Sequence, residues 1–280
     1  MESFIETAPG IRLYYTSTGE GRQTVLIPLA AWTNDFDVLA RGRRVVRYDP
    51  RGRGKSSAIE VSQATFDNDL ADLDCLREAL RDALGLDRVA LIGWSYYGGV
   101  VARYAMLHPE RVERFVTVGG MPLWRAGWAA AMQQDYMARM AALPPEVKQR
   151  SEEAQRSGER LAVWRSMVEV FRHTRMGRDP VRSLPQRLDD FPNERMANIM
   201  PRVTQAMQSM GDWDWRQDAA RLQVPALIIA GSADLVPQAA REWAEVLPAA
   251  KLCWMEGVGH FPAFEDPERF FAAVEEFLSA

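Results

Sequence analysis

A serine within a glycine-rich stretch is the first residue whose surroundings suggest chemistry. Ser95 lies in GWSYYGG, which is similar to the pattern G-x-S-x-G. In that pattern, small residues two places before and two places after the serine let a strand turn sharply into a helix, so that the hydroxyl is exposed. Gly93 fits, but Tyr97 occupies the later position. The Tyr97 side chain is expected to point outward, while Gly98 and Gly99 allow the helix to pack closely.

The hydroxyl of Ser95 would need two partners to act as a nucleophile. A histidine must take its proton, and a carboxylate must orient that histidine. Of the three histidines, His108 and His173 are expected at the surface or at helix ends. His260, in GVGHFPAFEDP, and Asp234, in AGSADLVP, each follow an expected strand. Ser95, Asp234 and His260 are therefore the candidate catalytic triad.

Short, mostly apolar runs recur along the chain and are typical of parallel strands buried on both faces. They cover residues 25–27, 45–48, 89–92, 115–118, 226–230 and 251–255, after a hairpin expected over 4–15. Helical patterns between them include residues 66–84, 98–107 and 268–278. This alternation predicts an α/β fold with a doubly wound, mostly parallel sheet. The three candidates follow strands, so they are expected at the carboxyl edge of that sheet.

The alternation stops between about residues 122 and 215. This segment is helical in pattern, rich in Met, Trp and Arg, and interrupted by prolines. A helical insertion between two strands is expected to cover the carboxyl ends of the strands as a cap, because open α/β sheets bind ligands there. We therefore expect a core formed by residues 1–122 and 216–280, and a helical cap formed by residues 123–215.

These features together resemble the α/β-hydrolase superfamily, in particular its capped serine hydrolases, which include esterases and proline iminopeptidase-like enzymes. Serine, then aspartate, then histidine is the chain order of the triad in this fold. YDPRGRGKS at residues 48–56 is similar to the D-x-R-G-x-G-x-S turn of the family, and GHFPAFEDPERF at 259–270 also matches. The resemblance covers nearly the whole chain.

The resemblance also implies an oxyanion hole built from two backbone NH groups. The NH of Tyr96, at the start of the helix after the serine, is expected to supply one, where the helix dipole favours negative charge. The family usually has His-Gly after the first parallel strand, whereas this chain has Pro28 and Leu29 before Ala30. By position, Ala30 would supply the second NH. Leucine lacks the freedom of glycine at positive φ, so the loop could differ, with the Leu29 NH as an alternative.

Acyl transfer is the expected reaction. His260 would take the proton of Ser95, the serine would attack a carbonyl to form an acyl-enzyme, and water would then release the acid. No metal or organic cofactor is needed, and the sequence has neither a phosphate loop nor metal-ligand spacing. The preferred substrate is a carboxylic ester. The expected pocket residues are Leu29, Trp32, Trp94, Trp124 and Trp128.

Two other functions remain open. A proline iminopeptidase-like aminopeptidase would need a carboxylate in the cap for the ammonium group of its substrate, and the candidates are Asp189, Asp190 and Glu194. A non-hydrolytic ligand binder with this fold is the other alternative. The related dehalogenases and epoxide hydrolases have an aspartate at the nucleophile position, so Ser95 argues against both.

The composition of the chain argues against several classes of binding partner. A net charge of -4 disfavours a general role on nucleic acid or anionic membrane. Two short basic clusters between residues 41 and 55 are expected to form a solvated face: Arg41, Arg43 and Arg44, then Arg51, Arg53 and Lys55. Two cysteines far apart in the sequence suggest neither a disulfide framework nor a zinc site. The start, MESFIETAPG, is unlike a signal peptide or membrane span. We expect a cytoplasmic enzyme acting on a small-molecule acyl substrate, with no nucleic-acid or membrane partner. The oligomeric state is not indicated.

Overall fold

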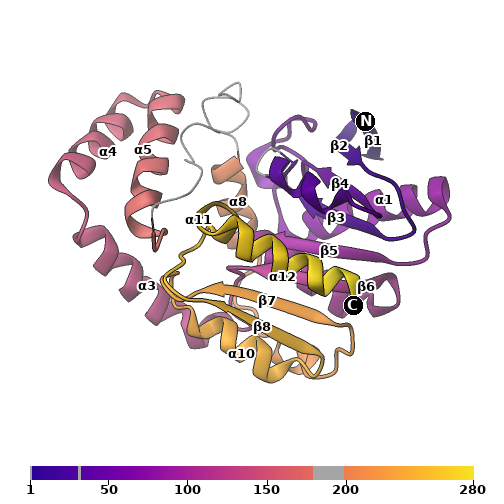
Figure 1. Cartoon of the computed structure of the whole chain (residues 1–280). Helices are drawn as coiled ribbons and strands as arrows, with labels where there is room; N and C mark the ends of the chain where they lie inside the picture. Colours follow the sequence, from indigo (N-terminus) through magenta and orange to yellow (C-terminus); the bar gives the residue numbers. More distant parts are fainter. Residues whose placement is uncertain (1, 31–32, 179–198) are drawn as a thin grey trace.

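An eight-stranded sheet forms the centre of the computed structural model, which describes residues 2–30, 33–178 and 199–280 (Figure 1). The strand order is β1-β2-β4-β3-β5-β6-β7-β8. The pairs β1/β2 and β2/β4 are antiparallel, and the other neighbours are parallel. The strands are β1 Glu2–Ala8, β2 Ile11–Thr18, β3 Thr24–Pro28, β4 Arg44–Tyr48, β5 Val89–Trp94, β6 Val112–Val118, β7 Ala226–Gly231 and β8 Ala250–Met255. The predicted α/β class and the opening hairpin are confirmed.

The central strands lie between helices, which explains their apolar runs. Every residue of β3 and β7 is buried. Figure 1 shows α12 (Pro267–Ser279) in front of the sheet, where Phe270 packs edge-on against Phe36 of the 3-10 helix η2 (Asn34–Ala40), with ring centroids 5.6 Å apart. The remaining described helices of this region are η3 Val61–Gln63, α1 Phe66–Leu84, α2 Tyr96–Leu107, η4 Pro109–Arg111, α9 Arg216–Ala219, α10 Gln238–Val246 and α11 Pro262–Glu265.

Local sequence signals fix the ends of α1. The Thr65 hydroxyl accepts a hydrogen bond from the Asn68 NH at 3.2 Å, and Gly85 ends the helix in the left-handed conformation with φ 66. The apolar face of the helix, including Leu73, Leu76 and Leu80, is buried. The predicted range 66–84 for this helix is therefore confirmed.

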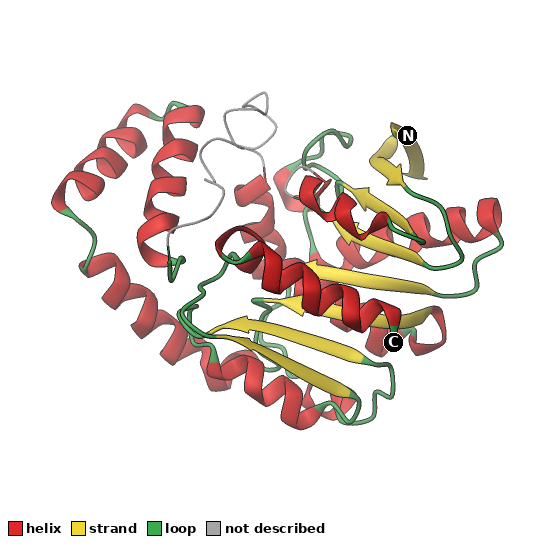
Figure 2. Cartoon of the chain, in the orientation of Figure 1, coloured by secondary structure: helices red, strands yellow, loops and turns green. Residues whose placement is uncertain are grey.

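Between residues 122 and 215 the structure describes four helices: α3 Arg125–Ala141, α4 Pro145–Ser157, α5 Arg160–Thr174 and α8 Ile199–Ser209. We call these helices the helical insertion. In Figures 1 and 2, α3, α4 and α5 form a group beyond one end of the sheet. The chain leaves and re-enters the core at neighbouring points, because Trp124 and Asp214 form a β-bridge and the Trp215 NH donates to the Leu123 carbonyl at 2.9 Å. Among the described residues, no helix is both long and apolar enough to cross a membrane.

Candidate active site

The turn at Ser95 holds a strained backbone. Ser95 has φ 55 and ψ -126, a conformation that residues with a side chain rarely adopt and that costs about 1–3 kcal/mol. It lies between β5 and the first residue of α2, and its NH donates to the Val118 carbonyl at 2.8 Å. A Cβ on Gly93 would lie 2.1 Å from the Tyr97 carbonyl oxygen, so glycine is required there. The turn therefore has the crowding expected of a nucleophile elbow.

Tyr97 does not point outward, so that expectation is wrong. Its side chain is buried, and its ring packs edge-on against Tyr96 with centroids 5.1 Å apart. Burial raises the pKa of Tyr97, which keeps the phenol neutral. Its hydroxyl has no hydrogen-bond partner in the described part of the chain. The ring is accommodated because α2 enters the core at this point, and Gly98 still approaches Gly120 closely.

Asp234 and His260 are in direct contact. Asp234 follows β7, and His260 follows β8. The Nδ1 atom of His260 lies 2.8 Å from Oδ2 and 3.0 Å from Oδ1 of Asp234. This contact suits an imidazole with its proton on Nδ1 and a free Nε2. The backbone of the histidine is also held, because its NH donates to the Arg175 carbonyl at 2.6 Å and its carbonyl accepts from the Trp94 indole at 2.7 Å.

Ser95 and His260 line one cavity of about 200 Å³. Asp234 and Arg175 also line it, but most of the wall is apolar. The apolar lining residues are Leu29, Trp94, Met121, Met132, Phe171, Ile199, Met200, Val203, Met207, Leu235 and Phe261. These come from the core and from the helical insertion, so the cavity lies where the two meet.

Of the expected pocket residues, Leu29 and Trp94 line this cavity. Trp124 and Trp128 are not among its lining residues; their indole NH groups donate to the two carboxylate oxygens of Glu242 on α10, at 2.9 Å and 2.6 Å. These two tryptophans therefore fix the start of α3 to the core, a long-range contact that composition does not reveal. Trp32 lies outside the described residues.

The loop after β3 adopts the conformation that the sequence put in doubt. Leu29 has φ 70, in the left-handed region, although it is not glycine. The Thr33 hydroxyl donates to the Leu29 carbonyl at 3.1 Å, and Arg47 donates to the Ala30 carbonyl at 3.4 Å. Tyr96 is the first residue of α2, so its NH has no acceptor within the helix. These contacts turn both carbonyls of the loop toward protein donors, and the Tyr96 NH is available for an anion.

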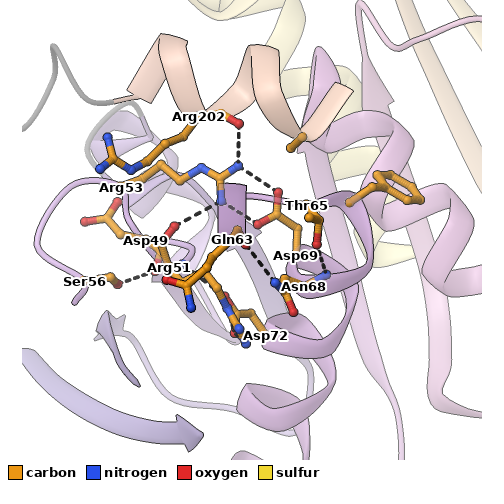
Figure 3. A network of polar contacts seen from close by, with 12 residues as sticks. Asp49, Arg51, Arg53, Ser56, Gln63, Thr65, Asn68, Asp69, Asp72 and Arg202 are labelled. Carbon is orange, nitrogen blue, oxygen red and sulfur yellow. Dashed lines mark hydrogen bonds and ion pairs between the residues drawn. The ribbon is translucent and has the colours of Figure 1, made fainter. Parts of the chain in front are cut away.

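A buried ion pair between Arg53 and Asp69, shown in Figure 3, contacts the side chain of Tyr96 next to the catalytic serine. The Arg53 guanidinium contacts both carboxylate oxygens of Asp69, at 2.6 Å and 3.0 Å, and neither side chain is exposed by more than 1%. The Tyr96 hydroxyl donates to the same carboxylate at 2.7 Å. Arg53 also donates to the carbonyl of Arg202 in α8 at 3.2 Å, so the pair joins the elbow to the helical insertion.

The charges in this network are matched. Burial raises the pKa of Asp69 to about 6, although Arg53 and Tyr96 both stabilise its charged form, so the carboxylate is mostly ionised at neutral pH. Arg51 and Asp72 form a second pair at 2.5 Å, next to the first in Figure 3. The expectation that the basic residues between 41 and 55 form a solvated face is therefore wrong for Arg51 and Arg53, and also for Arg43, which is buried and contacts Glu275 at 2.6 Å. In the described ranges, no group of three His, Cys, Asp or Glu side chains could hold a metal ion.

Comparison with known proteins identifies the family. The sequence profile of the alpha/beta hydrolase fold matches residues 29–267. The chain belongs to the α/β-hydrolase fold family. This α/β-hydrolase is 27% identical over 258 residues to a proline iminopeptidase of Heyndrickxia coagulans, covering 86% of this chain and 83% of the relative. It is 24% identical over 276 residues to a pimeloyl-[acyl-carrier protein] methyl ester esterase of Aliivibrio fischeri, covering 95% and 97%.

A solved structure is also similar to this chain over its whole length. The esterase EaEST of Exiguobacterium antarcticum superposes with a TM-score of 0.73 at 21% identity, covering 100% of both chains. This likeness shows the fold of the α/β-hydrolase and leaves its substrate open. The Arg53–Asp69–Tyr96 network was not predicted from the sequence. The arginine of the D-x-R-G-x-G-x-S turn is Arg51, which pairs with Asp72, whereas Arg53 occupies a variable position of that turn, so the motif gave no signal for this network.

Proposed function

We propose that this α/β-hydrolase cleaves a carboxylic ester through an acyl-enzyme on Ser95. The observation that carries the proposal is the 2.8 Å contact between His260 Nδ1 and Asp234, in a cavity that Ser95 also lines. A histidine oriented in this way keeps Nε2 available as a base. The backbone of Ser95 adds support: it is strained and lies at the N-cap position of α2, and such a turn exposes the hydroxyl at the start of a helix.

In the proposed mechanism, His260 takes the proton from Ser95 as the serine oxygen attacks the carbonyl carbon. The resulting negative charge on the carbonyl oxygen is stabilised by the NH of Tyr96 and a second NH from Ala30 or Leu29. His260 then gives its proton to the leaving alcohol, and the acyl-enzyme forms. A water molecule, deprotonated by the same histidine, releases the acid. Asp234 orients the imidazole and stabilises its charged form. We further propose that residues 123–215, which contain the helical insertion, act as a cap over the carboxyl ends of the strands.

The cavity favours an ester over an aminopeptidase substrate. An aminopeptidase must bind an ammonium group, for which a buried carboxylate is the natural partner. Among the described lining residues, Asp234 is the only carboxylate, and it contacts His260. Asp189, Asp190 and Glu194, the candidates for an ammonium site, lie outside the described residues. The apolar wall fits an acyl chain or an uncharged alcohol.

A comparison of two chromogenic substrates tests this proposal. We expect p-nitrophenyl acetate to be hydrolysed with a kcat/KM at least about 100-fold above that of proline p-nitroanilide, because no described group in the cavity compensates the ammonium charge. Initial rates at matched concentrations give both values. Rapid turnover of the anilide alone would make the proline iminopeptidase alternative correct. Hydrolysis of neither substrate, together with specific ligand binding, would favour the non-hydrolytic binder.

Gly119 provides a second test, because it packs directly behind the His260–Asp234 contact. A Cβ at this position would lie 2.9 Å from His260 Nδ1 and 3.0 Å from Asp234 Oδ2. We expect Gly119→Ala to displace the imidazole and lower kcat by about 100-fold with little change in KM, since small misplacements of catalytic groups have large effects. The measurement is steady-state kinetics on p-nitrophenyl acetate.

The matched control for Gly119→Ala is Gly42→Ala. Gly119 has φ 53 and Gly42 has φ 72, so both variants place alanine in the left-handed region, but no atom lies within 4 Å of a Cβ at residue 42. The control should lose stability without losing kcat. Equal loss of kcat in the two variants would show that contact with the histidine is not the cause.

A further inference from the structure

Arg175 is a charged residue of the cavity wall that the ester mechanism does not use. It follows directly after α5 (Arg160–Thr174), and its backbone is fixed on both sides. Its NH donates to the Phe171 carbonyl at 2.8 Å, and its carbonyl accepts from the His260 NH at 2.6 Å. A Cβ on Gly259 would lie 2.2 Å from that carbonyl oxygen, so the two segments touch closely. Arg175 is therefore held beside the catalytic histidine, on the wall of the same cavity.

The guanidinium of Arg175 has no hydrogen-bond or ion-pair partner within residues 2–30, 33–178 and 199–280. The guanidinium carbon lies over the ring of Tyr136, 5.9 Å from the ring centroid. Burial lowers the pKa of Arg175, an effect that the nearby Asp234 opposes. A cation removed from water without a partner is unfavourable, and a planar guanidinium can donate two parallel hydrogen bonds to a carboxylate.

The two carboxylates that interact electrostatically with Arg175, Asp234 and Asp135, are engaged elsewhere. Asp234 contacts His260 Nδ1, and its Oδ1 also accepts from the Leu235 NH at 2.6 Å. Asp135 contacts Arg139 at 3.0 Å and accepts from the Val236 NH at 3.2 Å. Arg139 completes its own hydrogen bonds with the carbonyls of residues 174, 233 and 234. Arg175 thus lines the cavity with side-chain donors that bind no acceptor in the described part of the chain.

We propose that Arg175 binds a carboxylate group of the substrate, so that the enzyme acts on esters of acids or alcohols that carry a second, ionised carboxyl group. The proposal rests on the proposed esterase function and adds a substrate class to it. A carboxylate suits the site better than a doubly charged phosphate, because Arg175 is the one permanently charged cation among the described lining residues and the carboxylate of Asp234 lies nearby. The remaining wall is apolar and would hold the uncharged part of the substrate.

Two matched pairs of esters test the proposal and locate the charge. Mono-p-nitrophenyl glutarate and p-nitrophenyl pentanoate differ by a carboxylate on the acyl part. The pair p-acetoxybenzoate and p-tolyl acetate differs by a carboxylate on the alcohol part. We expect the wild-type enzyme to favour the charged member of one pair by roughly 10- to 100-fold in kcat/KM, which is the effect of a charge-assisted hydrogen bond.

Arg175→Met should bring the ratio of kcat/KM between the charged and the neutral member of that pair to about one, since it removes the guanidinium charge and its hydrogen-bond donors and keeps an apolar side chain on the cavity wall. Arg172→Met is the control: Arg172 lies in the last turn of α5 just before Arg175, is exposed and does not line the cavity. The proposal is overturned if neither charged ester is preferred. It is equally overturned if Arg175→Met lowers both members of a pair alike, because Arg175 would then act on the triad and not on the substrate.

Binding measurements separate this proposal from the esterase function. In the Ser95→Ala background, calorimetry of mono-p-nitrophenyl glutarate and p-acetoxybenzoate measures affinity without turnover. Binding of one of them that is lost on adding Arg175→Met supports the carboxylate site even if the wild type hydrolyses no ester. Turnover of neutral esters, with no Arg175-dependent binding of either charged one, supports the esterase function and rejects the site.

Discussion

Ser95→Ala is expected to lower kcat for p-nitrophenyl acetate by roughly 10⁴- to 10⁶-fold, the loss seen when a triad nucleophile is removed from a serine hydrolase. The variant keeps the cavity and the His260–Asp234 contact but has no oxygen to form the acyl-enzyme. Its stability should not fall, because alanine removes only the hydroxyl from a strained position, and Ser95 caps no helix NH with its side chain. The residual kcat is measured by following p-nitrophenol release over long incubations with highly purified protein.

Covalent labelling gives a direct readout of the same prediction. A fluorophosphonate probe should label the wild type once per chain and leave Ser95→Ala unlabelled. Ser232→Ala is the matched control, since Ser232 lies at the same edge of the sheet but its hydroxyl donates to Glu256 at 3.0 Å and does not line the cavity. Labelling that survives in Ser95→Ala would place the nucleophile elsewhere. A folded wild type that resists the probe would favour a binding protein.

The sheet could be predicted because its physical signal is local. A strand buried on both faces must be apolar along its length, so β3, β5 and β7 stand out in the sequence. Because neighbouring strands are parallel, their carboxyl ends lie at the same edge of the sheet. Asp234 and His260, which are 26 residues apart in the sequence, meet at that edge. The start of α2 was predicted at residue 98 but lies at Tyr96. Two glycines weaken the helical pattern there, whereas the turn at Ser95 starts the helix at once.

Contacts between distant polar residues were not predictable in the same way. Arg53 and Asp69 are buried only because they pair, and a charged residue looks solvated in any sequence pattern. The hydrogen bonds from Trp124 and Trp128 to Glu242 were equally unpredictable, because the bonded residues are more than 100 positions apart in the sequence. Sequence patterns report which faces are apolar. They do not report which polar groups satisfy one another in the interior.

Asp69→Ala is expected to destabilise the protein by about 3–5 kcal/mol, the usual effect of removing one partner of a buried ion pair. The substitution leaves the Arg53 guanidinium buried without its carboxylate and deprives the Tyr96 hydroxyl of its acceptor. Unfolding in urea, followed by circular dichroism, measures the change in free energy. Asp67→Ala is the control on the same helix: Asp67 is exposed in the first turn, and its loss should change stability by less than about 1 kcal/mol.

A double variant separates pairing from packing. In Arg53→Met with Asp69→Leu, both charges are replaced by apolar groups, so no unpaired charge remains in the interior. We expect this variant to be more stable than Asp69→Ala, because the desolvation of two ions disappears together with their attraction. The single variants Arg53→Met and Asp69→Leu complete the cycle. If the double variant loses as much free energy of unfolding as these two lose in sum, the pair has no energetic coupling. The link from α8 through Arg53 to the Tyr96 side chain would then be a packing contact only, and activity should survive its removal.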